Sequence, residues 1–118
     1  MSRRTARVED LLRSEISWLI LREVRDPRVQ MTSVSAVDIS PDLRRAVVRL
    51  SVIGEEPERL ACLEALRNAR GFIRSRLANR LRNMRVLPEL VFEIDRGAEY
   101  SQRISDLLED LHEPDDSP

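Results

Sequence analysis

The spacing of apolar residues changes several times along this chain, and those changes limit the folds open to it. Over residues 6–25 apolar side chains recur every three or four positions, which predicts an amphipathic helix. Residues 32–39 and 46–52 are β-branched or alternating, which predicts two strands. A helical pattern returns over residues 58–84, and a third alternating run covers residues 90–94. This order predicts an α+β fold with a three-stranded mixed sheet and helices on one of its faces.

Proline and glycine mark the boundaries between these elements. Asp26-Pro27-Arg28 ends the first helix, because the residue before a proline avoids the helical region. Ser40-Pro41-Asp42-Leu43 has the chemistry of a turn. Apolar residues on both faces of the second strand predict that it is central in the sheet. After Gly97, apolar residues at helical spacing predict a last short helix over residues 100–111.

The charge balance divides the chain into two parts. Residues 1–103 contain all 20 arginines and 15 acidic residues, whereas residues 104–118 contain six acidic residues and no basic one. Acidic terminal segments of this kind are usually solvated and disordered. We expect a single domain over residues 1–103, with the end of the last helix and a partly disordered acidic tail over residues 104–118.

Seven arginines and no acidic residue lie between Ala65 and Pro88, although the formal net charge of the whole chain is -1. An ordinary solvated helix mixes both signs and gains from their pairing. The chain has no lysine, and the planar fork of arginine binds phosphate through two hydrogen bonds. This segment therefore predicts a polyanionic partner that is met at one face, and RNA fits best.

The helical pattern over residues 58–84 is expected to be two helices. On one straight helix, Arg70 and Arg74 would project close to the line that joins Leu63 to Leu77, and both would be buried. Burial of an unpaired charge costs several kcal/mol. We therefore predict a break at Ala69-Arg70-Gly71 that turns both arginines outward. The alternative is that Gly71 only permits close packing, while the arginines extend their charged ends to water.

Residue types that usually carry catalysis are scarce in this sequence. The single Cys62 excludes an internal disulfide and is expected to be a small buried residue, and His112 falls in the acidic tail. Asp38, Asp42 and Asp95 stand at strand ends, where such residues more often cap turns than act as acids or bases. We therefore expect a protein that is not an enzyme and has neither a metal nor a cofactor.

The sequence also contains no membrane or export signal that we can identify. Its apolar runs are far shorter than the roughly 20 residues that a membrane helix needs. The first residues lack the apolar region of a signal peptide. We expect a cytoplasmic monomer.

Several short motifs resemble, in their order and spacing, the ribosome-binding factor A family. The motifs are Arg4 to Val8, Asp26-Pro27-Arg28, Ser40-Pro41-Asp42-Leu43, Ala69-Arg70-Gly71, and Pro88-Glu89-Leu90-Val91-Phe92 before Asp95. The resemblance implies a type II KH-like topology, in which an Ala-x-Gly kink replaces the Gly-x-x-Gly loop of other KH domains. It also implies a non-enzymatic factor that binds the immature small (30S) ribosomal subunit and supports 16S rRNA processing and maturation. The resemblance further implies a role in cold adaptation. It also implies a GTPase that releases the factor, as a further partner.

The arginines are the expected contacts with rRNA. The first patch comprises Arg70, Arg74, Arg76, Arg80, Arg82 and Arg85; the second comprises Arg3, Arg4, Arg7 and Arg45. Changing Arg70, Arg74 and Arg80 together to alanine is expected to weaken RNA binding and leave folding intact.

The alternative is a generic RNA-binding module without preference for the ribosome. Such modules stack bases on exposed aromatic rings. Trp18, Phe72, Phe92 and Tyr100 all fall in apolar patterns and are predicted to lie in the core, which argues against that alternative.

Overall fold

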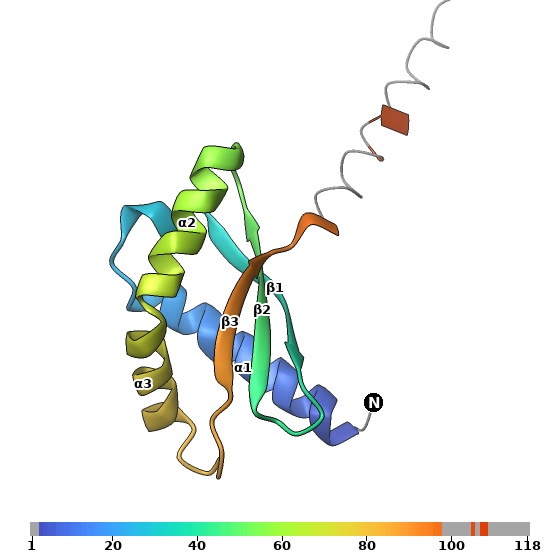
Figure 1. Ribbon diagram of the computed structural model, residues 1–118, viewed down its shortest axis with the longest axis vertical. Helices are drawn as coiled ribbons and strands as arrows, with labels where there is room; N and C mark the ends of the chain where they lie inside the picture. The colour runs from blue at the N-terminus through green and yellow to red at the C-terminus, as the bar shows by residue number, and fades with distance from the viewer. Residues whose placement is uncertain (1–2, 98–104, 106, 109–118) are drawn as a thin grey trace, which may run out of the picture.

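The computed structural model describes residues 3–97, 105 and 107–108, and its elements follow the predicted order (Figure 1). The elements are α1 (Arg3–Arg22), a 3-10 helix η1 (Pro27–Val29), β1 (Thr32–Ile39), β2 (Arg45–Val52), α2 (Glu56–Asn68), α3 (Arg70–Arg80) and β3 (Glu89–Ile94). Asp26 caps η1 by accepting a hydrogen bond from the Arg28 backbone N–H at 3.0 Å.

The three strands form one mixed sheet in the order β1-β2-β3. β1 and β2 are antiparallel neighbours, whereas β2 and β3 are parallel neighbours joined by the crossover through α2 and α3. The central position of β2 and the mixed sheet were both predicted from the sequence. Val37, Val48 and Phe92 are paired across the three strands and are all buried.

The helices cover one face of this sheet, as predicted. Along β2 the side chains alternate between buried and partly exposed, and the buried set is Ala46, Val48, Leu50 and Val52. Figure 1 shows α1 crossing behind the strands, with α2 and α3 beside β3. The buried side chains of all three helices and all three strands form one hydrophobic cluster.

Within the described residues, the other face of the sheet carries charged side chains and is not covered by a helix. Arg49 on β2 donates from Nε to Asp38 Oδ2 on β1 at 2.6 Å, and its Nη1 lies 3.3 Å from Glu93 Oε1 on β3. These ion pairs are partly exposed, and each is worth at most about 1 kcal/mol at such positions. One guanidinium thus connects all three strands on the solvent side.

Several predicted boundaries were wrong. α1 ends at Arg22 and α3 ends at Arg80, so residues 81–88 form a loop that holds Met84, Arg82 and Arg85. Leu81 has φ −117° and ψ 51°, which ends the helix although the apolar spacing continues beyond it. Leu60 is three positions before Leu63 and fits the apolar spacing of the helical pattern, yet it is 52% exposed.

α2 instead buries Cys62, Ala65 and Leu66, whose spacing of three and four positions places them on a single face. The predicted helix over residues 100–111 and the boundary at residues 103 and 104 lie largely outside the described residues. Of that segment, residues 105, 107 and 108 are described, and they are helical and exposed. Among the described helices, none has the length and apolar character needed to cross a membrane.

Candidate nucleic-acid interface

The predicted break between two helices is present, and it lies at Ala69. This residue has φ −86° and ψ 1°, outside both helices. The break leaves the local hydrogen bonds intact, because the Ala69 N–H still donates to Ala65 O and the Ile73 N–H donates to Ala69 O. Arg70 and Arg74 are consequently exposed while Ile73 is buried, as predicted.

Gly71 does not cause the break. It lies within the first turn of α3, and no positive φ angle is found there. A Cβ atom built on Gly71 would have no neighbouring atom within 4 Å. Neither backbone strain nor tight helix packing therefore requires a glycine at this position.

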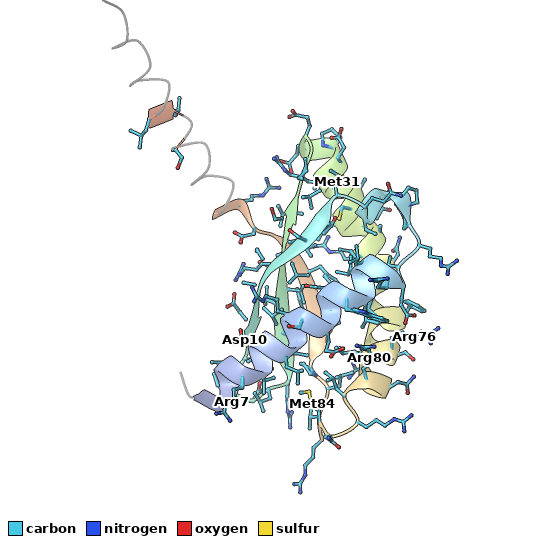
Figure 2. All side chains as sticks on the ribbon, turned by 180° about the vertical axis from the view of Figure 1, so that it is seen from behind. Arg7, Asp10, Met31, Arg76, Arg80 and Met84 are labelled. Atoms are coloured by element: carbon cyan, nitrogen blue, oxygen red, sulfur yellow. The ribbon has the colours of Figure 1, made fainter. Side chains whose placement is uncertain are left out.

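Two arginines of the first patch are engaged with α1 (Figure 2). Arg80 donates from Nε to the carboxylate of Glu15, and its guanidinium lies 4.1 Å from the centre of the Trp18 ring. Arg76 lies 3.5 Å from the Glu23 carboxylate. These contacts connect α3 to α1, so both arginines have a structural role in addition to any role in RNA binding.

The aromatic residues differ from the expectation. Phe92 is buried as predicted, but Trp18 is 39% exposed and Phe72 is 41% exposed. The Arg80 guanidinium lies over the Trp18 ring, and the Arg76 guanidinium lies 5.0 Å from the centre of the Phe72 ring. Guanidinium groups thus cover rings that were expected to be covered by apolar side chains, a favourable cation–π arrangement. Tyr100 lies outside the described residues.

The remaining arginines of the first patch are available to a ligand. Arg70, Arg82 and Arg85 are exposed, and in the described part of the chain they have no ion pair or side-chain hydrogen bond. Arg74 donates from Nη2 to the Leu87 carbonyl at 3.3 Å, which positions its guanidinium without neutralising its charge. These four residues form a cationic surface on α3 and the loop that follows it.

A groove runs beside this surface along α3. It has a volume of about 350 Å3 and is lined by Gly71, Arg74, Ser75, Ala78 and Leu87. The α3 residues that line the groove, other than Arg74, are small. A phosphate backbone can therefore come close to the helix. Arg74 stands at the side of the groove with its charge unpaired.

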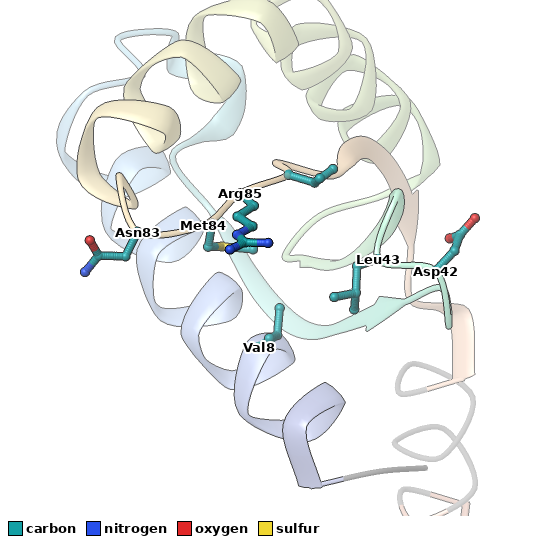
Figure 3. Close-up of a pocket in the computed structure, with 7 residues that line it drawn as sticks. Val8, Asp42, Leu43, Asn83, Met84 and Arg85 are labelled. Carbon is teal, nitrogen blue, oxygen red and sulfur yellow. The ribbon is translucent and has the colours of Figure 1, made fainter.

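The second patch lies at the start of α1 and the start of β2. Arg7 and Arg45 are both exposed, and Arg3 and Arg4 begin α1. Sequence reasoning did not predict that this region meets the loop after α3. The two regions share a pocket of about 410 Å3, which is lined by Val8, Asp42, Leu43, Asn83, Met84, Arg85 and Val86 (Figure 3). The signal available in the sequence was Met84 and Val86, apolar residues close to the end of the helical pattern.

The candidate acid–base residues have structural partners. Asp38 pairs with Arg49, and Asp95 accepts a hydrogen bond from the Ser35 hydroxyl at 2.6 Å. Asp42 accepts hydrogen bonds from the Ser40 hydroxyl and from the Arg44 backbone N–H, and these bonds lower the pKa of Asp42. No cluster of three or more potential metal ligands is found among the described residues.

Cys62 is buried, as predicted. Burial raises the pKa of its thiol, and a contact of 2.7 Å with the Thr32 hydroxyl partly opposes that rise. A thiol in this environment is a poor nucleophile at neutral pH.

The chain is similar to known proteins over most of its length. The family model described as ribosome-binding factor A matches residues 4–108. The chain is 45% identical to ribosome-binding factor A of Thermomicrobium roseum, over 95% of this chain and 86% of that protein. It is 41% identical to that of Rhodopirellula baltica, over 91% and 77% of the two chains.

Solved structures give the same result. The crystal structure of ribosome-binding factor A from Thermus thermophilus has a TM-score of 0.69 and 33% identity, and the match covers 78% of this chain and 97% of that one. Coordinates of the Thermus thermophilus factor fitted into the cryo-EM map of a 30S–RbfA complex have a TM-score of 0.62 and 32% identity, covering 75% and 91% of the two chains. This chain belongs to the ribosome-binding factor A family.

Proposed function

We propose that this protein binds the immature small (30S) ribosomal subunit as a transient assembly factor and supports processing and maturation of 16S rRNA. The observation that carries the proposal is the cationic surface of Arg70, Arg74, Arg82 and Arg85. It lies on a fold that matches coordinates fitted into the map of a 30S–RbfA complex. The protein would act in the cytoplasm as a monomer and would not be an enzyme.

The mechanism that we propose is electrostatic. Exposed guanidinium groups bind rRNA phosphates and hold one conformation of the rRNA until its processing is complete. The groove along α3 would receive the phosphate backbone, with Arg74 at its side. Binding through a limited patch on a chain of net charge -1 makes the complex sensitive to salt and therefore releasable. We expect the factor to matter most in the cold and its release to involve a GTPase, as the family resemblance implies.

The contacts of Arg80 change the choice of variant that tests this proposal. Its replacement would disturb the packing of α3 on α1 and confuse loss of binding with loss of structure. Arg70, Arg74 and Arg82 changed together to glutamine remove three charges from the exposed surface and keep side-chain length. Arg13, Arg22 and Arg25 changed to glutamine provide a matched control, because these exposed arginines of α1 and its C-terminal end also lack acidic partners among the described residues.

The experiment is co-sedimentation of the protein with small subunits, whole ribosomes and free structured RNA over a series of salt concentrations. We expect preference for small subunits, and a salt dependence that is less steep in the first triple variant. Each lost phosphate contact lowers the slope of log affinity against log salt by roughly 0.7–0.9. Equal binding to all three partners would instead support a generic RNA-binding module. Equal losses in both triple variants would reject the assigned surface.

A further inference from the structure

The pocket between the two arginine patches has mainly apolar walls. Val8 comes from α1, Leu43 from the β1–β2 turn, and Met84 and Val86 from the loop after α3. In Figure 3 the side chains of Val8, Leu43 and Met84 point toward a common space, Arg85 extends across it, and Asp42 points away. A volume of about 410 Å3 is within the range of about 300–1,000 Å3 that is typical of small-molecule binding pockets.

Arginines are sequence neighbours of the pocket-lining residues in three segments, and one of them, Arg85, itself lines the pocket. Arg7 precedes Val8 on α1, Arg44 and Arg45 follow Leu43, and Arg85 with its neighbour Arg82 lies in the loop. All five arginines are exposed, and no ion pair joins any of them to an acidic side chain within the described residues. Arg44 is close enough to Asp42 for its charge to help lower the pKa of that carboxyl group. A polyanion that contacts both patches would therefore pass across the opening of an apolar pocket.

The backbone that forms one wall is held in an uncommon conformation. Leu43 has φ 62°, a left-handed conformation that costs a residue with a bulky side chain on the order of 1–2 kcal/mol. Its N–H donates to Ser40 O at 2.8 Å, and its side chain packs against the edge of the core beside the pocket. Backbone strain of this kind is found preferentially at binding sites.

We propose that this pocket receives one unstacked nucleobase of the RNA that the arginine patches bind, so the proposal rests on the proposed function. Proteins read RNA sequence mainly through bases that leave the stack and enter such sites. Val8, Leu43 and Met84 would contact the faces of the base. Arg85 would stack on the base or donate to its ring and carbonyl acceptors, while Arg7 and Arg82 bind the adjoining phosphates. An apolar side chain of a ribosomal protein is the competing occupant. Arg85 in the pocket wall and the exposed arginines next to the lining residues in sequence favour RNA.

The identity of the occupant can be tested by photo-crosslinking. A benzoylphenylalanine at position 86 suits this purpose, because Val86 is 54% exposed at the mouth of the pocket. In complexes with small subunits we expect an adduct that ribonuclease removes. An adduct that only protease removes would identify a protein occupant and overturn the proposal. Absence of any adduct from position 86, when the same crosslinker at position 70 reacts with RNA, would also overturn it.

A second experiment asks whether the pocket contributes to affinity without any change in charge. Val86→Trp fills the pocket, and Ile53→Trp is the matched control at the other end of β2, on a side chain that is 70% exposed. Stacking of one base on a protein is worth roughly 1–3 kcal/mol. We therefore expect V86W to bind small subunits at least about tenfold more weakly, equivalent to about 1.4 kcal/mol. I53W should bind within about twofold of the unmodified protein.

The two proposals fail in different ways. If V86W binds as well as the unmodified protein, or better, while the arginine triple variant binds weakly, the nucleobase pocket is rejected and the proposed function stands. If the unmodified protein shows no preference for small subunits, the proposed function is rejected, and the pocket proposal is rejected with it. Thermal unfolding of V86W close to that of the unmodified protein would exclude misfolding as the cause of weaker binding.

Discussion

The contact between Arg80 and α1 leads to a quantitative prediction about stability. Arg80→Ala removes an ion pair with Glu15 and a cation–π contact with Trp18 in one step. A partly exposed ion pair contributes about 0.2–1 kcal/mol, and an exposed cation–π contact contributes about 0.5–1 kcal/mol. We expect the free energy of unfolding to fall by about 1–2 kcal/mol. With an unfolding entropy of about 2.1 cal/mol/K per residue over 118 residues, the unfolding midpoint should fall by about 4–8 °C.

The assay is urea unfolding followed by the fluorescence of Trp18, the single tryptophan in the chain. Because Trp18 is itself one of the contacts, the same unfolding curves should be recorded by circular dichroism. Arg82→Ala is the matched control, since Arg82 is exposed and has no partner among the described residues. Its free energy of unfolding should change by no more than about 0.5 kcal/mol.

A double-mutant cycle separates the two interactions. Glu15→Gln combined with R80A measures the ion pair, and Trp18→Leu combined with R80A measures the contact with the ring while keeping an apolar side chain there. We expect a coupling free energy of about 0.5 kcal/mol or more in each cycle. If R80A is as stable as R82A and both couplings are near zero, then Arg80 does not hold α3 to α1. The assignment of its structural role would then be withdrawn.

Three further predictions follow from local geometry. Gly71→Ala should raise the free energy of unfolding by about 0.5–1 kcal/mol in thermal or urea unfolding, because the position is helical and open; lower stability would show that the glycine is needed. Cys62 should react with a thiol reagent at neutral pH only as fast as the protein opens, because burial raises its pKa; rapid labelling of the native protein would contradict this. Hydrogen bonds from Arg28 lower the pKa of Asp26, so their contribution to stability is present above the ordinary aspartate pKa of about 3.9 and is lost as the pH falls through the lowered value. Asp26→Asn should therefore weaken the acid dependence of thermal stability, and an unchanged dependence would contradict the assignment.

The sequence was sufficient for the features that depend on neighbouring residues. Alternation between residues 46 and 52 predicted a strand, and apolar residues on both of its faces predicted its central position. The projection of Arg70 and Arg74 onto an apolar line predicted a break in the helix. Periodicity could not locate the end of α3, because apolar spacing continues to Met84 while the backbone leaves the helical region at Leu81.

The contacts that sequence reasoning missed join distant parts of the chain. Arg80 and Glu15 are 65 positions apart, and no local pattern connects them. The same holds for Trp18, which was predicted to lie in the core because its spacing fits the apolar stripe of α1. An apolar stripe predicts the direction of a side chain only approximately. How much of the Trp18 ring remains exposed depends on the packing of α3, whose Arg80 lies over that ring. The pocket was missed for a similar reason, because three segments far apart in sequence form its walls.

The parallel pairing of β2 with β3 has a consequence for the order in which this molecule becomes active. All seven arginines between Ala65 and Pro88 lie on the crossover that this pairing closes. Contacts between distant segments require the intervening chain to be ordered first, which makes them slow to form. During synthesis, a chain that ends before Glu89 would already contain those arginines but would lack β3, the strand that closes the crossover and packs against α2 and α3. We therefore expect a newly made molecule to complete the proposed RNA-binding surface only after residues 89–94 have emerged and paired with β2.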